Sequence, residues 1–197
     1  KYNNSLSLNY RNKKINLFSN YSNDFGRYRE DLDIYRIQSD TTYNQHSYTA
    51  NNNNTNNVKA GIDYTINNRN TIGAMVIGNF YYGSSFTNSN TIISPDNTGI
   101  PEKILYATNT IPSTRNNIDY NLNYRYADTS GRELDASADI ITFKKRGISY
   151  QPNYYKTPNT DTLLDEIVYQ NNAPTDITIY TAKIDYEQPL FKGKLGY

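Results

Sequence analysis

The sequence lacks cysteine and tryptophan altogether and contains a single histidine. Without cysteine, neither disulfide bonds nor thiolate metal sites can form. Long apolar runs are missing too, because no stretch approaches the roughly 18 consecutive apolar residues of a transmembrane helix. A β-strand crosses a membrane with only about 9–11 residues, so this absence leaves membrane-spanning strands open.

Charge of one sign is not concentrated anywhere in the chain. The formal net charge is +1, and the longest basic cluster is Lys144, Lys145 and Arg146, which is too little for an electrostatic footprint on nucleic acid. A phosphate-binding loop, a dinucleotide fingerprint and a nucleophile elbow are missing as well, so no motif makes a positive case for catalysis. We therefore expect no enzymatic activity, no cofactor, no metal site and no nucleic-acid partner.

The sequence does combine low hydropathy with many aromatic residues. Hydrophobic residues make up 36% and the mean hydropathy is −0.83, so a thick two-sided core would be hard to fill. The 21 tyrosines and 6 phenylalanines are nevertheless too many for a disordered chain. Strands with one apolar and one polar face reconcile these observations. An outer-membrane β-barrel has such strands, because its lumen is polar.

Runs of alternating polarity recur along the chain. The clearest hairpin spans residues 117–144. Keeping its two apolar faces on one side places Tyr126 opposite Leu134, which leaves a three-residue loop with Gly131 in the left-handed position. Similar alternation occurs in 2–11, 15–22, 58–66 and 178–186, whereas 71–83 is apolar in both phases and its faces cannot be distinguished.

The same register predicts a wall of charged residues facing the lumen. Arg125 is placed opposite Asp135, as a structural ion pair on the polar face. The other charged residues expected on this face are Lys59, Asp63, Asp119, Glu133, Asp139, Lys183 and Asp185. They form either an ion-pair network that holds the wall in register or, less simply, contacts to a plug or a passing ligand.

Short turns and long polar connections alternate along the chain. Short turns lie near residues 13, 68, 130 and 192, and long connections fill roughly 23–56, 84–115 and 146–175. We expect no proline within a strand, because the missing N–H would interrupt the hydrogen bonding. The pattern predicts an all-β fold: an antiparallel up-and-down transmembrane β-barrel segment of about seven to eight strands, with short periplasmic turns and long extracellular loops. Residues 1–197 are expected to be a single segment of a larger barrel, without a domain boundary.

Aromatic residues are expected to form two belts at the two membrane interfaces. One belt lies near the short turns and the other towards the long connections. The first consists of Tyr10, Tyr64, Tyr124, Tyr126 and Tyr186, and the second of Tyr21, Phe80, Tyr81, Tyr82 and Phe143.

Three stretches resemble the outer-membrane β-barrel region of TonB-dependent receptors. They are VKAGIDYTINNRNTIGAMV, NNIDYNLNYRYADTSGRELDASADI and TAKIDYEQPLFKGKLGY. The resemblance implies a large barrel in the bacterial outer membrane, an N-terminal plug that fills it, and nutrient uptake driven by an inner-membrane energy-coupling protein. The ligand is not identified by it, and neither a plug nor a coupling box occurs in this sequence.

A fragment of a longer protein is the simpler reading. The last strand-like run, 194–197, offers about four residues where a span needs about 9–11. An unpaired sheet edge is costly in lipid, so we expect the rest of the barrel to be supplied by a parent chain or a partner.

Aromatic residues in the long connections are the candidates for binding a sugar or a peptide, since loops carry function more often than walls do. They are Tyr43, Tyr48, Phe86, Tyr106, Tyr150, Tyr154 and Tyr155. His46 is interpreted as an exposed loop histidine, and the asparagine-rich run 51–57 as a mobile outer loop. Two alternatives to a receptor stay open: a structural or assembly subunit of an outer-membrane complex, and a soluble secreted β-rich adhesin.

Overall fold

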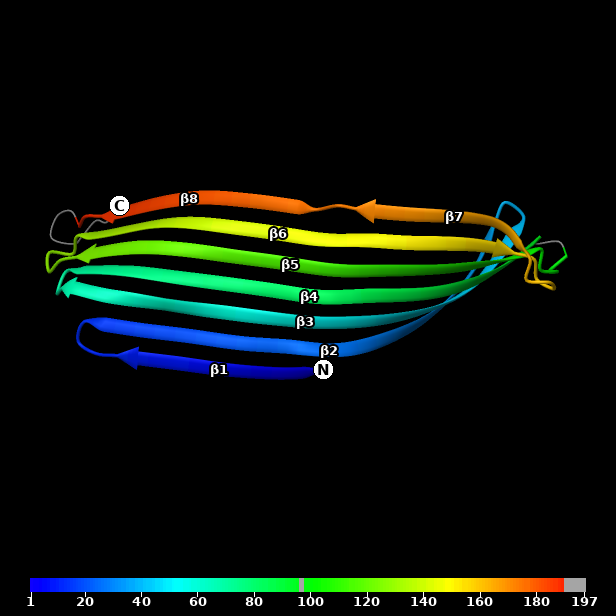
Figure 1. Ribbon diagram of the computed structural model, residues 1–197. Coiled ribbons are helices and arrows are strands. Elements are labelled where there is room, and N and C mark those ends of the chain that lie inside the picture. Colours follow the sequence, from blue (N-terminus) through cyan, green and yellow to red (C-terminus); the bar gives the residue numbers. More distant parts are fainter. Residues whose placement is uncertain (96–97, 190–197) are drawn as a thin grey trace.

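The computed structural model describes residues 1–95 and 98–189, and this part of the chain forms one antiparallel sheet of eight strands (Figure 1). The strands are β1 (Tyr2–Arg11), β2 (Ile15–Gln38), β3 (Thr41–Asn67), β4 (Asn70–Pro95), β5 (Lys103–Ala127), β6 (Glu133–Lys156), β7 (Leu163–Asn172) and β8 (Thr175–Glu187). Each strand from β1 to β6 pairs with the next along the chain, and β8 also pairs with β6. The predicted all-β, up-and-down architecture is confirmed, although the described sheet is not closed. The turn and strand expected after residue 190 lie outside the described residues.

β7 and β8 are two halves of one interrupted strand that follows β6 along its length (Figure 1). Ile148 lies opposite Asn172 in one half and Lys145 opposite Thr175 in the other, so the register is the same on both sides. Residues 173–174 interrupt the pairing, and the second of them is a proline, which has no N–H to donate.

The strands are much longer than a membrane requires. β2 to β6 have 24–27 residues each, or roughly 80–90 Å at about 3.3 Å per residue, whereas a span needs about 9–11. The long connections predicted at 23–56, 84–115 and 146–175 are therefore present as hairpins and not as irregular loops, and this part of the prediction is wrong. Both faces of these hairpins are largely polar, so apolar and polar residues do not alternate along them. The sequence pattern that identifies a strand is therefore missing there.

The asparagine-rich run 51–57 is part of β3, and its interpretation as a mobile loop is wrong. Side-chain amides hold it to both neighbouring strands. Asn23 Nδ2 of β2 donates to Asn54 Oδ1 at 2.6 Å, and Asn79 Nδ2 of β4 donates to Asn57 Oδ1 at 2.5 Å. These cross-strand hydrogen bonds stabilise a sequence that has little intrinsic preference for β-structure.

Two prolines lie inside strands, contrary to the prediction. Pro112 is in β5 and Pro152 is in β6. In the β5–β6 register, which is otherwise constant, the pairs that would contain these prolines and their neighbours at 109–112 and 148–151 are mostly missing. The missing N–H groups are thus accommodated by local gaps in one ladder, while Pro112 remains opposite Ser84 in β4.

The register brings the alternating apolar residues of the membrane-length runs to one face of the sheet, here called the apolar face. One row across it contains Leu17, Ile62, Ala74, Leu122 and Ala138. The nine charged residues assigned to the wall, from Lys59 to Asp185, all have the opposite parity in this register. They lie on the other face, here called the polar face.

The register also resolves 71–83, where the sequence could not distinguish the faces. Ile72, Val76 and Tyr82 are on the apolar face, because they lie opposite residues of that face in β3 and β5. Met75 and Ile77 are on the polar face.

The sheet is a single layer, so it has almost no core of its own. Ile93 is the one large apolar side chain that is buried in the described part of the chain, whereas Leu122 and Ile184 are 60% and 74% exposed. An apolar face of this kind needs a lipid or protein environment to cover it.

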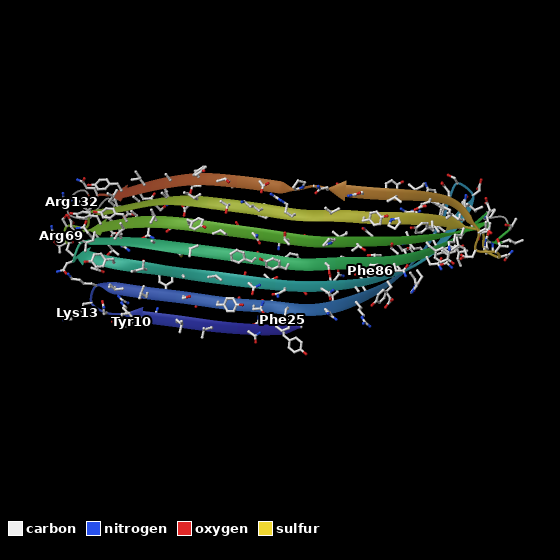
Figure 2. All side chains as sticks on the ribbon, viewed as in Figure 1. Tyr10, Lys13, Phe25, Arg69, Phe86 and Arg132 are labelled. Carbon is white, nitrogen blue, oxygen red and sulfur yellow. The ribbon has the colours of Figure 1, made fainter. Side chains whose placement is uncertain are left out.

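The aromatic belts are formed in part as predicted. Tyr64 and Tyr124 flank Ile72 near the short turns, and Tyr82 lies towards the other end. Tyr81 and Phe143 are on the polar face and cannot belong to a lipid-facing belt, so their assignment is corrected. Lys13, Arg69 and Arg132 lie at the short-turn end, whereas Phe86 lies towards the other (Figure 2).

Candidate functional site

The polar face of the membrane-length segment carries a hydrogen-bonded network. Asn121 Nδ2 donates to Asp139 Oδ1 at 2.6 Å, and Thr181 Oγ1 donates to Asp139 Oδ2 at 2.9 Å. On the same face, nearer the β1 edge of the sheet, Asn16 Nδ2 donates to Asp63 Oδ2 at 3.0 Å. These bonds join side chains on neighbouring strands, so they support the register of the wall.

Arg125 lies opposite Asp135 as the register predicted. Its Nε is 3.9 Å from Asp135 Oδ1, but its Nη2 is only 3.0 Å from Glu133 Oε2. Glu133 is therefore the closer partner of Arg125. It can take this place because it lies two positions from Asp135 in β6 and so points to the same face of the sheet. All three side chains are 39–59% exposed, so solvent screens the interaction.

Asp119 is the exception on this face. It lies between Ile77 of β4 and Ile141 of β6, and its Oδ1 is buried without a hydrogen-bond partner among the described residues. Sequence reasoning placed Asp119 in the ion-pair network, whereas the structure surrounds it with apolar neighbours.

The seven aromatic residues proposed to bind ligand do not form one site. Tyr43 and Tyr155 lie on the polar face of the hairpins. The other five, Tyr48, Phe86, Tyr106, Tyr150 and Tyr154, lie on the continuation of the apolar face. Tyr106 and Tyr154 are directly opposite each other, with the Lys156 Nζ 5.3 Å from the centre of the Tyr106 ring.

A groove crosses the polar face of the hairpins, from β3 to β6. Two apolar residues, Leu105 and Ala107, line it together with hydroxyl and amide side chains. The hydroxyl and amide side chains are those of Gln45, Ser47, Thr87, Ser89, Thr91, Thr108, Asn109, Gln151 and Asn153. Further towards the hairpin tips, on the same strands, lies a hollow of about 480 Å³ that is lined in part by Tyr43, Ile93 and Tyr155. This volume is within the range of about 300–1,000 Å³ that small-molecule sites occupy.

The hydroxyl groups of this groove form rows across the strands. Ser47 Oγ donates to Ser89 Oγ at 3.0 Å, and the hydroxyls of Thr49 and Thr87 are 3.0 Å apart. Ser47, Thr91 and Asn153 are 6–7% exposed, which is unusual for polar residues in a single-layer sheet. Sequence reasoning missed the groove, because its residues come from four distant segments that only the register brings together.

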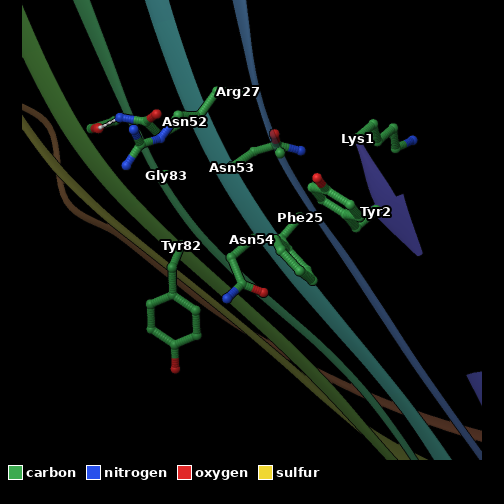
Figure 3. A pocket seen from close by; sticks show the side chains of 11 residues that line it. Lys1, Tyr2, Phe25, Arg27, Asn52, Asn53, Asn54, Tyr82 and Gly83 are labelled. Atoms are coloured by element: carbon green, nitrogen blue, oxygen red, sulfur yellow. Dashed lines mark hydrogen bonds between the residues drawn. The ribbon is translucent and has the colours of Figure 1, made fainter. Parts of the chain in front are cut away.

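A second hollow lies where β1 begins, on the apolar face (Figure 3). Tyr2 and Phe25 stack there with ring centroids 5.3 Å apart, and Tyr82 lies in the same row of the sheet. Arg27 and Asn52 lie on its distal side. We assign this hollow to the aromatic belt, because its rings continue the belt at the margin of the apolar face.

His46 is exposed, as predicted, but it belongs to β3 and not to a loop. Its Nδ1 is 2.7 Å from Asp33 Oδ1, and both side chains are more than half exposed. Among the described residues, no group of three or more His, Cys, Asp or Glu side chains could hold a metal ion. The same residues contain no helix that is long and apolar enough to cross a membrane.

The turn between β5 and β6 has the most strongly perturbed carboxyl group among the described residues. Ser130 Oγ donates to Asp128 Oδ1 at 2.6 Å, and the backbone N–H groups of Ser130 and Arg132 donate to the same oxygen. The Ser130 hydroxyl, and then these N–H groups, hold the pKa of Asp128 well below its ordinary value, although burial opposes the shift.

Comparison with protein families supports the reading of the fold. Residues 125–197 match a family described as outer membrane protein beta-barrel. A comparison with curated proteins finds no match. Together with the long amphipathic strands, the family match assigns the chain to the bacterial outer membrane.

Proposed function

We propose that this outer-membrane β-barrel chain is part of the wall of a receptor that takes up a nutrient in a TonB-dependent manner, and that it is not an enzyme. The observation that carries the proposal is the continuity of the polar face. The face of the sheet that carries the hydrogen-bonded membrane-length wall also carries, further along the same strands, the groove on the distal hairpins. A ligand captured at the hairpins would enter the lumen along one polar surface.

In this proposal the apolar face meets lipid and the polar face meets the lumen. An apolar face with residues as exposed as Leu122 and Ile184 would be unfavourable in water. The described sheet has free edges at β1 and at β7–β8, and unpaired backbone groups are costly in lipid. We infer that further strands close the barrel, and that a plug and an inner-membrane energy-coupling protein act through the parent chain.

Bacterial genetics tests the uptake role. Strains that lack either the parent protein or the energy-coupling protein are compared for growth on a panel of limiting nutrients. Any nutrient that the strain without the parent protein cannot use should also be one that the strain without the energy-coupling protein cannot use.

Two outcomes would contradict the uptake role. If loss of the parent protein affects no nutrient but disperses an outer-membrane complex, the chain is a structural or assembly subunit. If the parent protein is soluble without detergent, a secreted adhesin is the better account.

A further inference from the structure

We propose that the groove on the polar face of the distal hairpins binds a neutral, hydroxyl-rich ligand of the oligosaccharide class. The inference rests on the proposed function, because it assumes that the polar face is open to the passing ligand. It goes beyond that function by naming the chemistry of the ligand.

The first argument is the absence of charge. The polar-face residues of the hairpins are the odd-numbered positions in 41–53, 85–95, 105–113 and 147–155. None of these positions carries a charged side chain. The charged residues lie around the groove and not in it. Glu102, Lys103 and Asp165 line the hollow near the tip, Arg36 of β2 stacks on the Tyr43 ring, and Glu30 lies on β2 at the side. The floor of the groove itself is therefore neutral.

The second argument is the density of hydroxyl and amide groups. Ser47, Ser89, Thr49 and Thr87 are linked in cross-strand pairs. Each hydroxyl has one donor and two acceptor sites, so a pair retains capacity for a further partner. Sugar hydroxyls, which both donate and accept, match such a surface. An anionic metal chelate would instead need arginine or lysine within the groove.

The third argument is shape. A row of small residues, Gly26, Asn53, Gly83, Ser113 and Gly147, crosses the sheet at the membrane side of the groove. At this level the Tyr81 ring lies over Gly83 on the polar face, so an aromatic ring adjoins the membrane side of the groove. At the tip side, Tyr43 and Tyr155 line the adjoining hollow and offer apolar rings with polar ends.

A peptide fits these observations less well. It would bring charged termini and side chains that need their own pockets, whereas the groove has no charge and few apolar members beyond Leu105, Ala107 and Ile111. Peptide binding is therefore the competing outcome of the test.

The test uses the full parent protein, purified in detergent after its folding has been verified by heat-modified migration. Binding is measured to neutral gluco-, xylo- and mannohexaose, to a ferric catecholate chelate and to hexapeptides. The groove variant is Ser89→Ala with Gln151→Ala. The matched control, Asn88→Ala with Asn90→Ala, changes the opposite face of β4.

We expect at least one neutral hexasaccharide to bind, with an affinity that does not depend on salt, because no charge is involved. The groove variant should weaken this binding about tenfold or more, as expected for the loss of two hydrogen-bonding groups, and the control should not. Binding of only the chelate or a peptide, no binding of any hexasaccharide, or equal effects of both variants would overturn the inference. Those outcomes leave the barrel and its uptake role standing, whereas a parent protein that is soluble without detergent would overturn the proposed function itself.

Discussion

At the scale of single residues, aromatic rings on this sheet cover glycines. The Phe18 ring lies so close to Gly61 that a Cβ added there would collide with its Cζ and would be 3.0 Å from the carbonyl oxygen of Ala74. Phe18 is directly opposite Gly61 in the β2–β3 register. The ring thereby replaces the contacts that a glycine in a strand does not make.

Gly61→Ala should therefore destabilise the parent barrel by about 1–3 kcal/mol, because the added methyl group displaces the Phe18 ring. Unfolding by denaturant in lipid vesicles measures the effect. The same substitution in a Phe18→Ala background should cost much less, since the ring is absent. Additive costs in the double-mutant cycle would contradict the contact.

The Asp128 turn predicts a defined pH dependence. Because its pKa is lowered in the folded protein, its contribution to stability is complete above the ordinary value of 3.8 and is lost as the pH falls below that value towards the lowered pKa. Asp128→Ala should lower the melting temperature of the refolded barrel at pH 7 and lower it less at pH 2. An equal difference at the two pH values would show that the carboxylate charge is not responsible.

Residue contacts were only partly predictable from the sequence. The pairing of Tyr126 with Leu134, the three-residue loop and the left-handed Gly131 follow from the apolar alternation, and the structure has all three. The preference of Arg125 for Glu133 over Asp135 does not follow, because side-chain direction decides it. Ser39 and Asp40, which form a tight turn with φ of 48° and 57°, carry no glycine signal.

At the scale of the strands, membrane-length segments were predictable and their extensions were not. In β5, apolar residues alternate with polar ones from Ile118 to Tyr126, and lipid imposes this contrast. From Lys103 to Asn116 neither face has to be apolar, and cross-strand hydrogen bonds alone maintain the ladder. The groove lies in this second part, so sequence periodicity gave no sign of it.

The two faces of β5 predict opposite responses to the same substitution. Leu122, on the apolar face between Ala74 and Ala138, is 60% exposed. Leu122→Lys should cost about 2–4 kcal/mol, as expected for a lysine that faces the middle of a bilayer. Asn121→Lys should cost much less, because its amine can pair with Asp139 on the polar face. Equal costs in vesicle unfolding experiments would show that the faces are wrongly assigned.

At the scale of the whole molecule, the pairs of neighbouring strands in the described sheet follow the order of the strands in the sequence. Every strand neighbours the next in sequence, apart from the interruption that divides β7 from β8. This order was predictable because each short turn joins two alternating runs. The closure of the barrel and the ligand were not, since both depend on more than the described sheet.

The central claim is that the chain crosses the outer membrane with its short turns in the periplasm and its distal hairpins outside the cell. The sequence has no cysteine, so Asp40→Cys in the β2–β3 turn and Asn68→Cys in the β3–β4 turn can be introduced singly into the parent protein. Intact cells are treated with a membrane-impermeant maleimide, and the unsubstituted parent serves as the background. Our account predicts that the cysteine at position 40 is labelled in intact cells and the one at position 68 only after the outer membrane is permeabilised. Labelling of both positions in intact cells, or the reverse order, would contradict it.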